Sequence, residues 1–242
     1  MSYELELVAL AVVLYLYDST VLLSANEAVF ICAGRRAWRV STGLRGFLVG
    51  GRTVCVLNPL VPYAPCAKLR WDLCAAGPTQ PANETWSIEL PKLKVVAPWV
   101  MAAGLALFIL LPLGLFTSLG VYAILTAVAV LYGSILVALV LLRRAGLLRS
   151  MSTVKYMGLI FECLACPPFG VNIIRRVALM SKVNESLLGA GQRLLAPPEW
   201  SRVRAHCVAV LDRELLACDD NAPERLALEA QRARLSEQTT PS

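Results

Sequence analysis

The sequence has little of what most enzymes use for catalysis. Among its 242 residues there is a single histidine, His206. No G-x-S-x-G nucleophile motif accompanies it. The Gly50-Gly51 pair belongs to neither of the usual phosphate-binding loops, G-x-x-x-x-G-K-[ST] and G-x-G-x-x-G. These absences exclude the common hydrolase and nucleotide-binding signatures. We therefore lean toward a protein that is not an enzyme and needs no cofactor.

Charge is missing from one long stretch. The residues from Val95 to Leu142 include no Asp, Glu, Lys, Arg or His. A helix of roughly 20 residues spans a hydrocarbon core about 30 Å thick, so this run is long enough for two spans, 95–116 and 119–142. A buried hairpin in a soluble core would need a large surrounding protein, and the rest of the chain is too small and too charged. We predict a transmembrane helical hairpin over 95–142.

Bases are missing from the N-terminal region. Residues 1–31 carry four acids, and the first base is Arg35. A secretory signal peptide starts with a positive region and ends at a small-residue cleavage site. We therefore predict a retained first transmembrane helix over about 5–25, with its inner flank reaching residue 31. A helix lying in the membrane interface is less favoured, because both faces of 7–16 are apolar.

The bases that are present give a topology. They flank the three predicted spans, at Arg35, Arg36 and Arg39, at Lys92 and Lys94, and at Arg143, Arg144, Arg149 and Lys155. All three flanks are cytoplasmic together if the N-terminus and the hairpin turn lie outside. Such flanks favour topology and contact with anionic lipid over nucleic acid. Richness in Ala, Leu, Arg and Val suggests a bacterial genome, so we expect a multi-pass inner (plasma) membrane protein with a cytoplasmic C-terminus.

The remaining segments predict small modules on the cytoplasmic side. Residues 32–94 form a basic, β-rich insert, in which Gly50-Gly51 is a two-residue hairpin turn. Its expected strands are 37–42, 47–49, 52–57, 68–73 and 85–90. Residues 143–181 form a basic, interfacial amphipathic segment. Within it, 156–174 has one charge, Glu162, so a fourth span or a re-entrant segment stays open, although Pro167-Pro168 favours a bend.

The C-terminal part, 182–242, is expected to be a helical cytoplasmic tail. One helix covers about 199–217 and a second starts near Pro223-Glu224. Proline is well suited to a first helical turn. Residues 238–242 are expected to be disordered. The fold class is thus a mainly α-helical membrane protein with three transmembrane helices, a small β-rich insert and a helical tail.

Few residues qualify as a functional site. Asp18 and Glu27 are the intramembrane polar candidates, because a carboxylate in a span is costly and often functional. The structural alternative is pairing of either acid with Arg35 or Arg36. Cys163 and Cys166 have metal-ligand spacing but no credible second pair of ligands, so they are weak candidates and we expect no metal site.

Three functions fit this sequence. A non-enzymatic accessory or scaffold protein, holding a partner at the membrane or associating with itself, fits the small modules and the lack of catalytic motifs. A transporter or channel component would use Asp18. A membrane-bound enzyme would use His206 or the cysteine pair. We favour the first.

Overall fold

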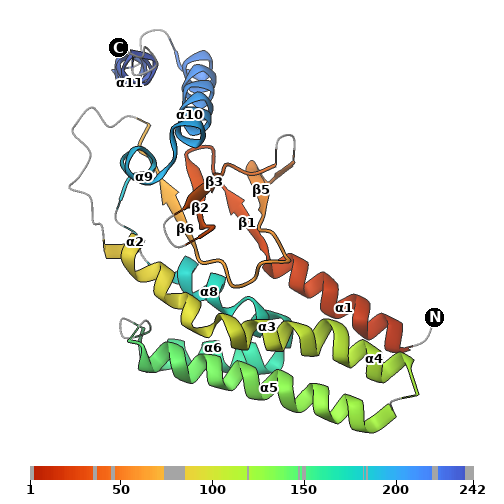
Figure 1. Cartoon of the computed structure of the whole chain (residues 1–242). Helices are drawn as coiled ribbons and strands as arrows, with labels where there is room; N and C mark the ends of the chain where they lie inside the picture. Colours follow the sequence, from red (N-terminus) through yellow and green to blue (C-terminus); the bar gives the residue numbers. More distant parts are fainter. Residues whose placement is uncertain are drawn as a thin grey trace. The chain divides into compact units, whose positions relative to one another are not determined.

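The structure is a computed structural model of the chain. It describes residues 3–34, 37–44, 47–73, 85–118, 120–146, 148, 151–181, 183, 185–219 and 223–237. These residues are mostly helical, with two small sheets (Figure 1). The chain packs as two compact units. Unit 1 contains Met1–Val21, Val56–Cys66 and Thr85–Ser181, and unit 2 contains Leu22–Cys55, Ala67–Glu84 and Lys182–Ser242. The sequence predicts consecutive segments, whereas these units interleave.

Unit 1 is helical. Its helices are α1 (Tyr3–Asp18), α2 (Thr85–Glu89), the 3₁₀ helix η1 (Leu90–Val96), α3 (Ala97–Leu105), the π-helical turn η2 (Ala106–Leu110), α4 (Leu111–Phe116), α5 (Gly120–Arg144), α6 (Thr153–Ala165), α7 (Pro167–Val171) and α8 (Ile173–Met180). The side chains buried at its centre include Leu93, Ile135, Leu139, Leu142, Ile173 and Ile174.

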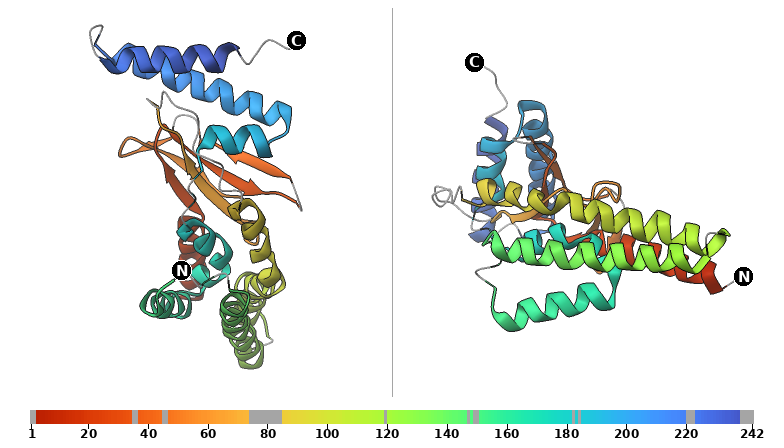
Figure 2. Two further views of the ribbon diagram at one scale, coloured as in Figure 1. Left: turned by 90° about the vertical axis from the view of Figure 1, so that its left-hand side faces the viewer. Right: turned by 60° about the horizontal axis from the view of Figure 1, so that its bottom comes forward.

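The predicted hairpin is present as two long helices that run antiparallel (Figure 2). Trp86–Phe116 is 31 residues long, because α2, η1, α3, η2 and α4 follow one another without a gap, and Gly120–Arg144 is 25 residues long. Both are long and apolar enough to cross a membrane. Leu119, the predicted start of the second span, lies outside the described residues.

Small residues and a proline shape this hairpin. A Cβ on Gly114 would come within 2.9 Å of Ile124 Cγ1 and 3.0 Å of its backbone nitrogen, so only glycine lets the helices approach here. Pro112 cannot donate to the carbonyl four residues back. Just before it the helix widens, and Leu111 N donates to Ala106 O, one residue further back than in an α-helix. The π turn therefore lies directly before the proline.

The first helix is shorter than predicted. α1 ends at Asp18 after 16 residues, and 20–23 are a strand, so the predicted helix over 5–25 is wrong beyond residue 18. At about 1.5 Å per residue, α1 is about 24 Å long, less than the ~30 Å hydrocarbon core. Its N-terminal end lies at the same end of unit 1 as the hairpin turn (Figures 1 and 2).

Residues 156–174 are not one continuous helix. α6 ends at Ala165, where Cys166 leaves helical geometry, and Pro167 and Pro168 begin α7. A second break at Asn172 precedes α8. α6 runs antiparallel to α5, beside its C-terminal half (Figure 2). The structure thus has the proline bend in place of an unbroken fourth span.

Unit 2 contains most of the two sheets together with three helices. The strands are β1 (Thr20–Leu23), β2 (Glu27–Cys32), β3 (Trp38–Ser41), β4 (Leu48–Val49), β5 (Arg52–Val56) and β6 (Cys66–Arg70), ordered β1-β5-β4 and β3-β2-β6. The helices are α9 (Leu187–Leu194), α10 (Pro197–Ala217) and α11 (Pro223–Glu237). The buried side chains of this unit include Phe30, Leu69, Trp71, Leu187, Cys207 and Leu211.

The predictions for the β-rich insert and the helical tail are correct in part. Gly50 and Gly51, at φ 57° and 75°, form the expected turn between β4 and β5. The predicted tail helices are present as α10 and α11. The strand predicted over 85–90 is wrong, because Thr85–Glu89 is helical. β1 and β2 were expected to be helix or its flank. The tail end, 238–242, lies outside the described residues.

Candidate functional site

Asp18 is the last residue of α1 and lies in a polar cluster of unit 1. Its Oδ1 is 3.9 Å from Arg176 Nη1, and its side chain is mostly buried. Its other oxygen, Oδ2, is buried and has no hydrogen-bond partner, and neither has Arg176 Nη1. The predicted partners, Arg35 and Arg36, lie outside the described residues. Among the described residues, Asp18 therefore forms its ion pair with Arg176, and this pair is incompletely formed.

Arg176 is shared between two carboxylates. Its Nη2 donates to Glu162 Oε2 on α6, while Nη1 faces Asp18. Its guanidinium also lies over the Phe169 ring, 4.6 Å from the centroid. A single cation on α8 thus joins α1, α6 and α7. From the sequence, Arg176 was only one base of the segment 143–181 that was predicted to be interfacial.

The neighbouring Arg175 belongs to a fully buried network. Its Nη2 donates to the carbonyls of Asn58 and Val61, and its Nη1 is 3.4 Å from Ser19 Oγ. Asn172 Nδ2 donates to the same Ser19 Oγ at 3.0 Å. Arg175 is 3% exposed, and Ser19 and Asn172 are fully buried. The network holds the irregular stretch 57–65 against the end of α1, and the sequence offered no signal for it.

Glu27, the second intramembrane candidate, lies in unit 2 and begins strand β2. Its Oε2 is 2.7 Å from Lys68 Nζ and accepts a hydrogen bond from Ser24 N at 2.8 Å. Burial alone would raise the pKa of this carboxyl group. The hydrogen bonds from Lys68 and Ser24 outweigh burial, so its pKa is lowered. Glu27 fixes the turn between β1 and β2 and the contact with β6.

Cys163 and Cys166 are not arranged as a ligand pair with further donors. Cys163 is fully buried on α6, whereas Cys166 is the residue between α6 and α7. Among the residues that the structure describes, no group of three or more His, Cys, Asp or Glu side chains could hold a metal ion. The expectation of no metal site stays a prediction, testable by elemental analysis.

His206 and Cys207 lie on α10. Cys207 is buried, and burial raises the pKa of its thiol to about 12. A thiol held in its neutral form is a poor nucleophile, because the thiolate is the reactive species. Cys207 therefore packs as a core residue, beside Val203 and Leu211 on the same buried face.

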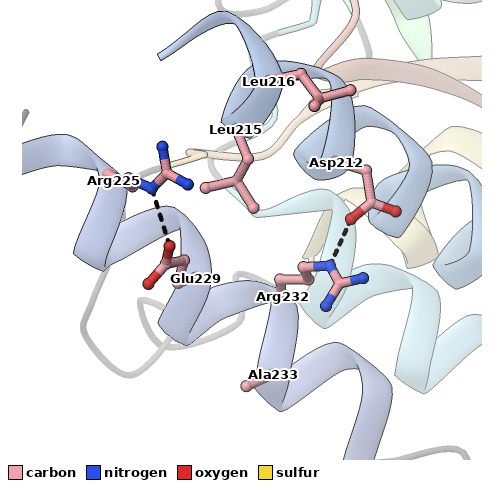
Figure 3. A pocket seen from close by; sticks show the side chains of 7 residues that line it. All are labelled: Asp212, Leu215, Leu216, Arg225, Glu229, Arg232 and Ala233. Atoms are coloured by element: carbon pink, nitrogen blue, oxygen red, sulfur yellow. Dashed lines mark hydrogen bonds and ion pairs between the residues drawn. The ribbon is translucent and has the colours of Figure 1, made fainter. Parts of the chain in front are cut away.

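Helices α10 and α11 line an open groove of about 510 Å³ (Figure 3). Arg225 pairs with Glu229 at 3.1 Å, and Arg232 pairs with Asp212. Leu215 points into the space between these two ion pairs (Figure 3). The groove is thus mixed in chemistry, with an apolar floor and charges of both signs at its rim. Its lining residues are Asp212, Leu215, Leu216, Arg225, Glu229, Arg232 and Ala233.

Comparisons give no family for this chain. No protein-family model matches it, and no curated protein or solved structure matches it significantly.

Proposed function

We propose that the chain is a multi-pass protein of a bacterial inner (plasma) membrane that acts as a non-enzymatic accessory or scaffold protein. One observation carries the proposal. The same chain joins two helices long and apolar enough to cross a membrane to a separately packed unit with an open groove. The hairpin would anchor the protein, and the groove between α10 and α11 would hold a partner.

The exposed side chains of unit 1 support the anchoring role. Both long helices and α1 present apolar residues outward, among them Leu7, Leu10, Val13, Leu105, Ile109, Leu113, Val121, Leu125, Leu136 and Val140. Exposed apolar surface of this extent marks contact with a membrane or another protein. α1 would be a third, short span, accommodated by tilt or local thinning of the bilayer.

The arrangement of unit 1 supports a topology with the N-terminus outside. The N-terminal end of α1 lies at the same end as the hairpin turn (Figure 1), as this topology requires. The bases Lys92, Lys94, Arg143 and Arg144 all belong to the other ends of the two long helices. Bases prefer the cytoplasmic side of short loops. The sheets and the tail helices would then be cytoplasmic.

Reporter fusions test the anchoring. A reporter active only in the cytoplasm should be active when fused after Arg149 and silent when fused at Ser118. The reverse pattern would overturn the topology. Release of the full chain from membranes by alkaline carbonate would overturn the anchoring itself.

Retention of a partner tests the scaffold role. Leu216 lines the groove and is strongly exposed on α10. Changing it to Gln should reduce the amount of a membrane protein that co-purifies in mild detergent. The matched control is Leu60→Gln, an equally exposed leucine outside α10 and α11. Equal retention by both variants would argue against the groove as the partner site.

A transporter or channel component is the second candidate. It is favoured by the incomplete pair in which Asp18 Oδ2 and Arg176 Nη1 lack hydrogen-bond partners. Ionisable groups within a membrane often mark proton or ion pathways. A single such pair is a poor continuous path, so we place this function second. The Asp18 variants described in the Discussion separate the two.

A further inference from the structure

Helix α6 has two unlike apolar faces. Tyr156, Leu159 and Cys163 are buried against the rest of unit 1. On the other side, Val154, Met157 and Phe161 are 81%, 57% and 72% exposed. At about 100° per residue, these three lie within an arc of about 60°. We call them the α6 stripe.

Cations flank the connection between α5 and α6. The Arg143 guanidinium lies 4.5 Å from the centroid of the Tyr156 ring, and the Tyr156 hydroxyl donates to Leu139 O at 3.5 Å. Arg144, at the end of α5, and Lys155, at the start of α6, are both exposed. No acid occurs in the sequence from residue 143 to residue 161. The first acid, Glu162, is bound to Arg176. The start of α6 is therefore cationic.

We propose that the α6 stripe and these bases form a binding surface for an anionic phospholipid. The acyl chains would cover Val154, Met157 and Phe161, and the headgroup would contact Arg144 and Lys155. Two observations select a lipid over a protein segment. Helix α6 runs beside the C-terminal half of α5, whose Leu136 and Val140 are also exposed. The cations are complementary to an anionic headgroup.

This surface rests on the proposed membrane location, and it adds a specific lipid class and a role for α6. In this arrangement α6 lies within one leaflet, the one at the C-terminal end of α5. It would follow α5 toward the membrane interior without crossing. The break at Cys166 and Pro167 then returns the chain toward the same side. Backbone breaks are tolerated at such depth where protein covers them, and Pro168 and Gly170 are buried.

Photo-crosslinking tests contact with the acyl chains. The full chain is reconstituted in vesicles that contain phosphatidylglycerol with a diazirine in its acyl chain. Irradiation should label the tryptic peptide 156–175, which contains Met157 and Phe161, as well as the hairpin peptide 95–143. Labelling of 95–143 alone would overturn the α6 proposal and leave the membrane proposal standing. Labelling of neither peptide would overturn both.

Headgroup preference tests the cations. The native protein should bind phosphatidylglycerol more strongly than phosphatidylcholine. This preference for phosphatidylglycerol should fall by about five-fold for each base removed, because one base near an anionic surface contributes about that factor to binding. The test variant removes two bases, Arg144→Gln with Lys155→Gln. The matched control changes two exposed arginines of α10, Arg202→Gln with Arg213→Gln, and should keep the preference. Equal losses in both pairs, or no native preference, would overturn the proposal.

Discussion

Arg175 and Arg176 are adjacent in the sequence, but their guanidinium groups are satisfied to very different degrees. Arg175 donates to two backbone carbonyls and lies within reach of Ser19 Oγ and Asn172 Oδ1. Arg176 leaves Nη1 without a hydrogen bond. A buried donor without a partner costs about 1–3 kcal/mol. The Asp18–Arg176 pair is therefore the part of the cluster that has most to gain from a rearrangement.

Substitution of Asp18 separates a structural role from proton transfer. Asp18→Asn keeps the shape and the hydrogen-bonding capacity of the side chain, and Arg176 keeps its ion pair with Glu162. We expect it to be nearly neutral for stability. Asp18→Leu removes the polar contact and should cost about 0.6–2 kcal/mol, the range for polar contacts between membrane helices. Detergent stability and partner retention measure both variants.

Glu162→Gln is the control for these variants, because it removes the closer of the two carboxylates at Arg176. It should destabilise the protein at least as much as Asp18→Asn. A proton-carrying Asp18 would give another pattern. Asp18→Asn would then fold normally yet fail as completely as a deletion, because an amide cannot exchange the proton. That result would defeat the scaffold role and favour the transporter.

Glu27 makes the stability of unit 2 depend on pH in the acidic range. The folded-state pKa of this carboxyl group is lowered from its ordinary value of 4.5. Its contribution to stability is therefore fully present above about pH 4.5 and is lost as pH falls through the folded-state pKa. Glu27→Gln should cost about 1 kcal/mol at neutral pH, as expected for a partly exposed ion pair.

The difference between native protein and Glu27→Gln should shrink as the pH falls below 4.5. Denaturant unfolding of the full chain at pH 7 and at pH 3.5 measures it. Equal differences at both pH values would mean that the charge of Glu27 does not stabilise the fold.

At the scale of elements, the sequence predicted the features that have a local physical signal. A run of 48 uncharged residues gave the helical hairpin, and two glycines with positive φ gave the β4–β5 turn. Strands β1 and β2 were missed because short apolar runs do not distinguish strand from buried helix. Residues 85–90 alternate like a strand, but their continuation into η1 favours helix.

The candidate site was less predictable than the fold. Asp18 stood out because a carboxylate interrupts an apolar segment. Its partner Arg176 is 158 positions away in the sequence, and no local pattern points to it. The contacts of Arg175 with the carbonyls of Asn58 and Val61 were equally unpredictable. Every residue type has a backbone carbonyl, so the sequence does not show which one accepts a hydrogen bond.

Gly114 and Gly133 form a matched pair for testing the hairpin. A Cβ on Gly114 would meet Ile124 Cγ1 and its backbone nitrogen, whereas a Cβ on Gly133 meets nothing within 4 Å. Gly114→Ala should therefore destabilise the hairpin by about 1–3 kcal/mol, as overpacking does. Gly133→Ala should be neutral or stabilising. Unfolding in mixed detergent micelles measures both, and equal behaviour of the two variants would refute the close approach at Gly114.

At the scale of the whole molecule, the chain divides its chemistry between its two units. Unit 1 has the apolar helices and the Asp18–Arg176–Glu162 cluster, and unit 2 has most of the two sheets, the Glu27–Lys68 pair and the groove. A buried carboxylate also ties α9 to the segment before it, where Glu185 accepts two hydrogen bonds from Arg193. Such a division fits a protein in which one unit anchors and the other binds.

The interleaving of the units has a consequence for biosynthesis. Unit 2 takes its last stretch from Lys182 onward, whereas its first stretch ends at Cys55. At about 5–20 residues per second, a ribosome needs roughly 6–25 seconds to make the intervening chain. During that time strands β1 to β5 exist without α9, α10 and α11, and the hairpin emerges in between. The β-rich stretch therefore stays incompletely folded during this time, and its exposed strand edges favour misassociation.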